Sequence, residues 1–228
     1  MLQTRARGVF ITGTDTGVGK TVYACRLLET LGRKGLRAVG MKPVASGAGL
    51  LDGNCRNADA LAMMKAAPHP VPYERCNPYC FESAIAPHLA AQLEGAVIEL
   101  SVIRHVYKQL AAEADFVVVE GVGGWQVPLN ERETVADLVR LLDLPVILVV
   151  GIRLGCISHA LLSADSINRH QGQLLGWVAN VIDRQMPCRA QTIAAIESRL
   201  SVPLLDVIEF TNPPLSEKSQ QDVNISIL

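Results

Sequence analysis

The stretch "GVFITGTDTGVGKT", residues 8–21, decides the fold class of this chain. An apolar run typical of a buried strand leads into a glycine-rich turn, and a helix-forming segment begins at Lys20. Such a turn presents unpaired backbone N–H groups at the start of a helix, where the helix dipole favours a bound anion. The stretch therefore predicts a strand, a phosphate-binding loop and a helix.

Side chains in this loop suit a nucleoside triphosphate. Gly17 and Gly19 allow the backbone to approach phosphates closely. Lys20 can reach the β- and γ-phosphates, and the Thr21 hydroxyl can ligate Mg²⁺. The alternative is a glycine-rich turn between a strand and a helix that binds nothing.

The loop departs by one residue from the common pattern G-x4-G-K-[ST]. That pattern requires glycine at position 14, where this chain has Thr14, and its first glycine is Gly13. A partitioning-type ATPase would carry a signature lysine five residues before the loop lysine, and this chain has Asp15 there. The departure argues against that class of nucleotide switch.

Short apolar runs alternate with longer segments of helical pattern along the chain. The predicted strands are 9–12, 38–42, 116–120, 146–151, 174–180 and 204–208. The predicted helices are 20–33, 57–65, 99–113, 134–142, 157–170 and 189–200. Continuously apolar strands alternating with helices predict a doubly wound, mostly parallel α/β sheet of the P-loop NTPase type. The carboxyl ends of its strands would then share the edge where ligands of such sheets bind.

The composition fits one soluble α/β domain over residues 1–228. Hydrophobic residues make up 49%, charged residues 19%, and the formal net charge is −1, so we expect neither a nucleic-acid nor a membrane partner. We find no secretory signal or spanning segment and expect a cytoplasmic protein with free thiols rather than a disulfide framework. Residues 66–87 are predicted as a long proline-rich excursion, and residues 211–228 as a C-terminal tail.

Four further residues are candidates for the predicted ligand edge. Glu120 ends an apolar strand beside a second glycine-rich turn, as a metal-binding carboxylate would, or it could cap a helix or pair with an arginine. Asp59 is a candidate metal ligand or an ordinary acidic residue at a helix start. Lys42 could stabilise charge on a transferring phosphoryl group, or be a solvated strand-end lysine. Ser46 could donate a hydrogen bond to a substrate oxygen, or be an ordinary polar residue.

The stretch "LGCIS", residues 154–158, marks a second helix start after a strand. It is a potential site for a carboxylate or a phosphate. Because the sequence places no His or Asn as a catalytic partner, Cys156 is not predicted to be a nucleophile.

Taken together, several stretches resemble dethiobiotin synthetase, the ligase that closes the ureido ring in biotin synthesis. The matching stretches, in order between residues 13 and 180, are "GTDTGVGKT", "KPVASG", "RNADALA", "NPY", "APH", "VEGVGGW", "PVILVVGIRLGCISHA" and "GWVAN". The resemblance implies 7,8-diaminononanoate, CO2 (or bicarbonate) and ATP as substrates, with Mg²⁺ as the cofactor. It also implies a carbamate that ATP phosphorylates to a carbamic–phosphoric anhydride before the ring closes.

The resemblance also implies a role for each matching residue. Catalytic roles fall to Lys20, Lys42, Thr16 and Ser46, and Mg²⁺ binding to Thr21, Asp59 and Glu120. Nucleotide contacts fall to Thr14, Asp15, Thr16, Gly17, Val18, Gly19, Lys20, Thr21, Val22, Asp59, Glu120, Gly121, Val122, Gly123, Asn180, Val181, Glu209, Phe210 and Thr211. Substrate contacts fall to Lys42, Ser46, Gly155, Cys156, Ile157 and Ser158, the last four at the substrate carboxylate from a neighbouring subunit. The implied assembly is a homodimer with sites at its interface.

Two alternatives remain beside this ligase. One is a related ATP-dependent amide-forming enzyme, although the sequence shows no glutaminase half. The other is the partitioning-type switch that Asp15 argues against.

Overall fold

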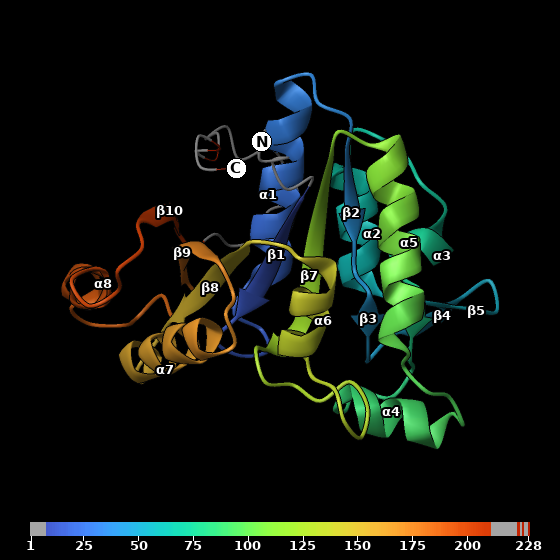
Figure 1. Cartoon of the computed structure of the whole chain (residues 1–228). Helices are drawn as coiled ribbons and strands as arrows, with labels where there is room; N and C mark the ends of the chain where they lie inside the picture. The colour runs from blue at the N-terminus through green and yellow to red at the C-terminus, as the bar shows by residue number, and fades with distance from the viewer. Residues whose placement is uncertain (1–7, 211–222, 224, 226–227) are drawn as a thin grey trace.

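A six-stranded parallel sheet forms the centre of the molecule, in the order β10-β9-β8-β1-β7-β2 (Figure 1). The computed structural model describes residues 8–210, 223, 225 and 228. The strands are β1 (Gly8–Gly13), β2 (Ala38–Met41), β7 (Phe116–Gly124), β8 (Val146–Ile152), β9 (Leu174–Val181) and β10 (Leu204–Ile208). The predicted doubly wound α/β fold is confirmed.

Helices cover both faces of this sheet (Figure 1). They are α1 (Lys20–Arg33), α2 (Ala58–Ala66), α5 (Leu100–Glu113), α6 (Val135–Leu142), α7 (Cys156–Arg169) and α8 (Arg189–Glu197). The first two pack on one face, and α5, α6 and α7 pack on the other. Within the described part of the chain, none of the helices combines the length and the apolar surface that crossing a membrane requires.

The core consists of two apolar layers, one on each side of the sheet. Val9 and Ile11 of β1 join the layer beneath α1, whereas Phe10 between them joins the opposite layer. Because successive side chains of a strand point to opposite faces, a strand buried on both faces must be apolar throughout. This explains the unbroken apolar run at the start of the chain.

Six short elements were absent from the sequence prediction. They are β3 (Val44–Ala45), β4 (Gly49–Leu51), β5 (Asn54–Arg56), α3 (Tyr73–Cys76), β6 (Tyr79–Cys80) and α4 (Pro87–Leu93). Most are too short to show a hydrophobic period, and β6 exists because it pairs in parallel with the distant β3. Residues 66–87, predicted as a loop, therefore contain a short helix and a strand.

Most predicted boundaries lie within one to three residues of the observed ones, but β7 is a clear exception. The strand continues to Gly124, so Glu120 lies within it and not at its end. Glycines at 121, 123 and 124 gave the appearance of a turn, although the strand continues beside β1 through an irregularity in its register, with φ of 60° at Gly123. Most of the predicted tail, residues 211–222, 224 and 226–227, lies outside the described residues.

Candidate functional site

A cavity of about 640 Å³ lies at the carboxyl edge of β1, β2 and β7. It brings together residues that the sequence predicted for nucleotide, metal and substrate binding. Those that line it are Thr16, Gly17, Gly19, Lys20, Thr21, Val22, Lys42, Ser46, Asp59, Glu120, Val122 and Gly123. The fold therefore gathers the candidates from four separate stretches of sequence around one space.

The phosphate-binding loop connects β1 to α1 and lines one side of the cavity. Gly19 is the N-cap of α1 and has a left-handed backbone with φ of 92°. The Lys20 ammonium donates a hydrogen bond to the backbone oxygen of Asp15, at 2.8 Å, so the lysine folds back across its own loop. Lys20 is nevertheless only 6% exposed. A bound anion at this helix start would meet both the amide groups and this charge.

Asn180, near the end of β9, forms a hydrogen bond to the phosphate-binding loop. Its side-chain amide donates to the backbone oxygen of Val18 at 2.8 Å. A Cβ atom on Gly19 would lie 1.9 Å from that amide nitrogen, far inside contact distance. Position 19 is therefore restricted to glycine both by its backbone angle and by Asn180.

Lys42 and Glu120 form a buried ion pair at the centre of the site. Lys42 Nζ lies 2.6 Å from Glu120 Oε1 and 3.0 Å from Asp59 Oδ2, and its side chain is 4% exposed. The Thr21 hydroxyl donates to Glu120 Oε1 at 2.9 Å. The alternative of a solvated lysine at position 42 is thereby excluded, and Glu120 pairs with a lysine and not with an arginine. Asp59 also lies in the first turn of α2. It therefore fits both alternatives, a metal ligand and an acidic residue at a helix start.

The two lysines have different electrostatic surroundings. Burial, together with the nearby charge of Lys42, lowers the pKa of Lys20 to about 8. Burial alone would also lower the pKa of Lys42, but the charges of Glu120 and Asp59 outweigh it and raise that pKa. Both side chains are therefore cationic at neutral pH, and Lys42 is the more firmly so.

Oxygen atoms in this cluster suit a magnesium ion. Mg²⁺ prefers hard oxygen ligands, which Thr21, Asp59 and Glu120 supply. Glu120 Oε2 is buried and has no hydrogen-bond partner, so one carboxylate oxygen is left for another ligand. Nowhere in the described ranges is a set of three or more His, Cys, Asp or Glu side chains placed to hold a metal, so the site here would combine two carboxylates with the Thr21 hydroxyl. The predicted residues therefore fit the ion.

The predicted carboxylate site at the start of α7 lies outside this cavity. Gly155 is the N-cap of α7 with φ of 91°, Gly155 and Ser158 are exposed, Ile157 is half-buried and Cys156 is buried. The preceding turn contacts the phosphate loop through an ion pair of 2.5 Å between Arg153 and Asp15. Within one chain, the α7 residues and the cavity residues are thus separate groups.

The remaining predicted nucleotide contacts are spread around the loop and the far edge of the sheet. Thr14 donates its backbone N–H to Val149 at 3.0 Å, and Gly121 accepts a 3.3 Å hydrogen bond from Lys42. Val181 ends β9 and is buried, whereas Glu209 pairs with Arg189 at 3.1 Å and Phe210 is exposed. Thr211 lies outside the described residues.

Several residues of the site were missed by sequence reasoning. Asn57 lines the cavity and caps α2, since its side chain accepts from the backbone of Asp59 and Ala60. Asn77 is buried and donates to the backbone oxygen of Lys42 at 2.6 Å. Residues 84–87 also line the cavity. An Asn immediately before a helical pattern was a usable signal for Asn57, and Asn77 begins the matching stretch "NPY", to which no role was assigned.

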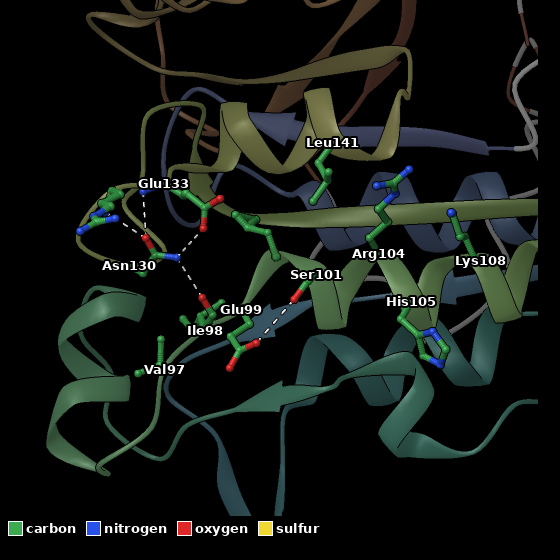
Figure 2. Close-up of a pocket in the computed structure, with 12 residues that line it drawn as sticks. Val97, Ile98, Glu99, Ser101, Arg104, His105, Lys108, Asn130, Glu133 and Leu141 are labelled. Carbon is green, nitrogen blue, oxygen red and sulfur yellow. Dashed lines mark hydrogen bonds between the residues drawn. The ribbon is translucent and has the colours of Figure 1, made fainter.

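A second cavity, of about 910 Å³, lies along α5 and the loop before α6 (Figure 2). At one end, Asn130 donates to the Ile98 backbone oxygen at 2.9 Å and to Glu133 at 2.8 Å. Arg104 and Lys108 project from α5 further along it. None of the residues predicted for nucleotide, metal or substrate binding lines this larger space, so its size does not make it the candidate site.

Comparisons with known proteins show the family of the chain. A family model described as an AAA domain matches residues 7–218. A curated ATP-dependent dethiobiotin synthetase from Aromatoleum aromaticum is 48% identical over 90% of this chain and 91% of its own length. Another from Cellvibrio japonicus is 46% identical over 89% of each chain. The chain belongs to the dethiobiotin synthetase family. The predictions of that family and of an ATP-dependent ligase are therefore confirmed.

Solved structures of more distant proteins share the fold of this dethiobiotin synthetase family member. The septum site-determining protein MinD from Pyrococcus horikoshii, complexed with Mg-ADP, has a TM-score of 0.55 at 18% identity, over 88% of this chain and 81% of its own. A ParA family ATPase from Chlorobium tepidum has a TM-score of 0.56 at 13% identity, over 90% and 85%. At these identities the likeness concerns the fold alone.

Proposed function

We propose that this protein makes dethiobiotin from 7,8-diaminononanoate and CO2, using ATP to close the ureido ring. The observation that supports this most strongly is the arrangement of charge in the cavity. Two buried lysines, Lys20 and Lys42, lie there with the oxygen ligands of Thr21 and Glu120, beside the glycine-rich loop at the start of α1. A site of this kind favours the transfer of a phosphoryl group.

The reaction proceeds in three steps. One amine of the substrate adds to CO2 and loses a proton, which gives a carbamate. A carbamate oxygen then attacks the γ-phosphorus of ATP and ADP departs, which leaves a carbamic–phosphoric anhydride. The second amine attacks the carbamate carbon, loses a proton and expels phosphate as the ring closes.

Residues of the cavity have complementary roles in these steps. Lys20 and Lys42 stabilise the negative charge on the carbamate and the transferring phosphoryl group. The Thr16 and Ser46 hydroxyls lie on the cavity wall and orient the amines and the carbamate. For Lys42, this role requires its ammonium to exchange part of its contact with Glu120 and Asp59 for contact with substrate.

Thr21, Asp59 and Glu120 would hold Mg²⁺, and the bound ion would neutralise negative charge on the ATP phosphates. The unpartnered Glu120 Oε2 supports this assignment. The purine would lie toward Asn180 and Val181, with Glu209, Phe210 and Thr211 contacting it through the backbone.

We further propose a homodimer in which the partner supplies the α7 start to each cavity. Gly155, Cys156, Ile157 and Ser158 lie outside the cavity of their own chain, yet their helix start suits a substrate carboxylate. Leu154 just before them is 92% exposed. A large apolar side chain left in solvent at this position is consistent with burial against another subunit.

A product assay tests the proposal. Purified protein with 7,8-diaminononanoate, bicarbonate, ATP and Mg²⁺ should give dethiobiotin by mass spectrometry, and ATP hydrolysis should require both the diamine and bicarbonate. ATP turnover that ignores the diamine but responds to DNA or to membranes would overturn the proposal in favour of a partitioning-type switch.

A further inference from the structure

Two cysteines that are 25 residues apart bring their sulfur atoms together outside the ligand cavity. Cys55 lies on β5, and Cys80 lies on β6. Their Sγ atoms are 2.7 Å apart, and both residues are half-buried. A disulfide bond requires about 2.05 Å between the sulfurs, so a small local shift is sufficient to reach bonding distance. Both thiols are free in the structure.

Neighbouring hydrogen bonds fix how the thiols are oriented. Asn77 donates its amide hydrogens to the backbone oxygens of Lys42, at 2.6 Å, and Tyr79, at 3.0 Å. Its side-chain oxygen therefore faces Tyr73 and accepts the Tyr73 hydroxyl hydrogen at 2.8 Å. The backbone N–H of Asn57 also donates to the Tyr73 oxygen, at 2.7 Å.

This network assigns the proton of each thiol. The Tyr73 oxygen lies 3.4 Å from Cys80 Sγ, and because the phenol hydrogen is already committed to Asn77, the Cys80 thiol is the donor. The Cys55 thiol donates in turn to Cys80. Burial, followed by this hydrogen bond, raises the pKa of Cys55 to about 12. Cys55 is thus held as a thiol that faces the sulfur of Cys80.

We propose that Cys55 and Cys80 are a site of reversible oxidation, at which a peroxide converts the thiol pair to a disulfide. The Cys80 sulfur, once deprotonated, attacks one peroxide oxygen, the O–O bond breaks, and hydroxide leaves to take up a proton. Cys80 is then a sulfenic acid. The Cys55 sulfur attacks the Cys80 sulfur, its proton goes to the departing hydroxyl, and water leaves as the S–S bond forms. Two thiols and one hydrogen peroxide give one disulfide and two waters.

The disulfide would enclose the segment that supports two residues of the ligand cavity. Between its ends lie Asn57, which caps α2 ahead of Asp59, and Asn77, which bonds to the backbone of Lys42. The closed loop restricts the unfolded chain, so the oxidised protein should melt at a higher temperature than the reduced protein. Because the inference depends on the thiol geometry alone, it does not rely on the proposed ring-closing activity.

Peptide mapping of the full chain tests the inference. The protein is treated with increasing hydrogen peroxide, alkylated with iodoacetamide, digested and analysed by mass spectrometry. A cross-linked peptide containing Cys55 and Cys80, lighter by two hydrogens and cleaved by dithiothreitol, is expected. Cys55→Ser should prevent the cross-link and leave Cys80 as a sulfenic acid that dimedone traps. Cys188→Ser, which removes an exposed thiol elsewhere, should leave the cross-link unchanged.

Two results would overturn the inference. One is that Cys55 and Cys80 remain fully alkylated in the wild-type protein while other thiols are oxidised. The other is that they cross-link only between separate chains. Both are read from the wild-type protein, so neither depends on whether a serine variant folds.

Discussion

Lys42 Nζ lies 2.6 Å from Glu120 Oε1, and both side chains are buried. The two residues are 78 positions apart, and the pairing of β2 with β7 brings them together. Met41, the last residue of β2, is opposite Val119 in that pairing, so Lys42 directly after β2 comes close to Glu120 of β7. The same ion pair therefore contributes to the stability of this edge of the sheet and supplies the positive charge of Lys42 that the proposed chemistry needs.

Replacing Lys42 should therefore affect folding as well as turnover. From the sequence alone, a strand-end lysine would contribute little to stability, whereas removing one member of a buried pair costs about 3–5 kcal/mol. We expect Lys42→Gln to lower dethiobiotin formation by about 100- to 1,000-fold and to lower the free energy of unfolding measured in urea. Lys65→Ala, at an exposed lysine of α2, is the control and should change neither. Near-normal turnover in Lys42→Gln would contradict the assigned role.

Glu120→Gln tests the magnesium assignment. The amide keeps the shape of the side chain but loses the charge, so the variant should need several-fold more Mg²⁺ for half-maximal turnover. The measurement is a Mg²⁺ titration of ATP-dependent product formation, with Glu133→Gln in the second cavity as the matched control. An unchanged Mg²⁺ requirement in Glu120→Gln would remove this residue from the metal site.

Gly19 and Gly17 form a matched pair for testing the phosphate loop. Both have positive φ, but a Cβ at position 19 would collide with Asn180, whereas none would be met within 4 Å at position 17. We expect Gly19→Ala to abolish ATP binding in calorimetry, and Gly17→Ala to weaken it only through backbone strain of about 1 kcal/mol. Equal losses in the two variants would show that the contact with Asn180 is unimportant.

Mixed dimers test whether each site uses two subunits. Lys42→Gln damages the cavity and Ser158→Asp places a negative charge at the start of α7, so each variant alone should be nearly inactive. Unfolding and refolding an equal mixture should restore part of the activity, because some dimers then contain one site with neither change. If the mixture is no more active than its components, the substrate site lies within a single chain.

The capping box of α6 provides a prediction about stability and pH. Asp137 accepts from the backbone N–H and the hydroxyl of Thr134, each at 2.9 Å. These hydrogen bonds, the backbone one first, lower the pKa of Asp137 below 3.8. The stabilisation is therefore fully present above the unfolded-state pKa and is lost as the pH falls through the folded-state value.

Asp137→Ala should thus cost about 1 kcal/mol at pH 7, equivalent to a decrease of roughly 2–4 °C in melting temperature. The difference from the wild type should shrink below pH 3.8. Thermal melts of both proteins across this range provide the measurement, with the exposed Glu131→Ala as a control. A difference that grows in acid would contradict the assignment.

The residues of the phosphate loop could be predicted because their signal is local. A strand, two glycines and a Lys-Thr pair follow one another within fourteen residues, at positions 8–21, and their backbone geometry depends on near neighbours. The apolar runs also predicted the six strands of the main sheet, since burial on both faces leaves a continuous pattern. The family followed from motifs in order along most of the chain.

Only the tertiary structure decided which distant residues contact each other in and around the site. Local sequence left Lys42 open between a solvated and a functional lysine, and placed Glu120 at a strand end when it lies within β7. The contacts of Asn77 with Lys42, of Asn180 with the loop, and of Cys55 with Cys80 likewise join distant segments. The physical reason is that the sheet order determines which strands become neighbours, and long-range packing sets that order, whereas hydrophobic periodicity reports only which faces of each strand are buried.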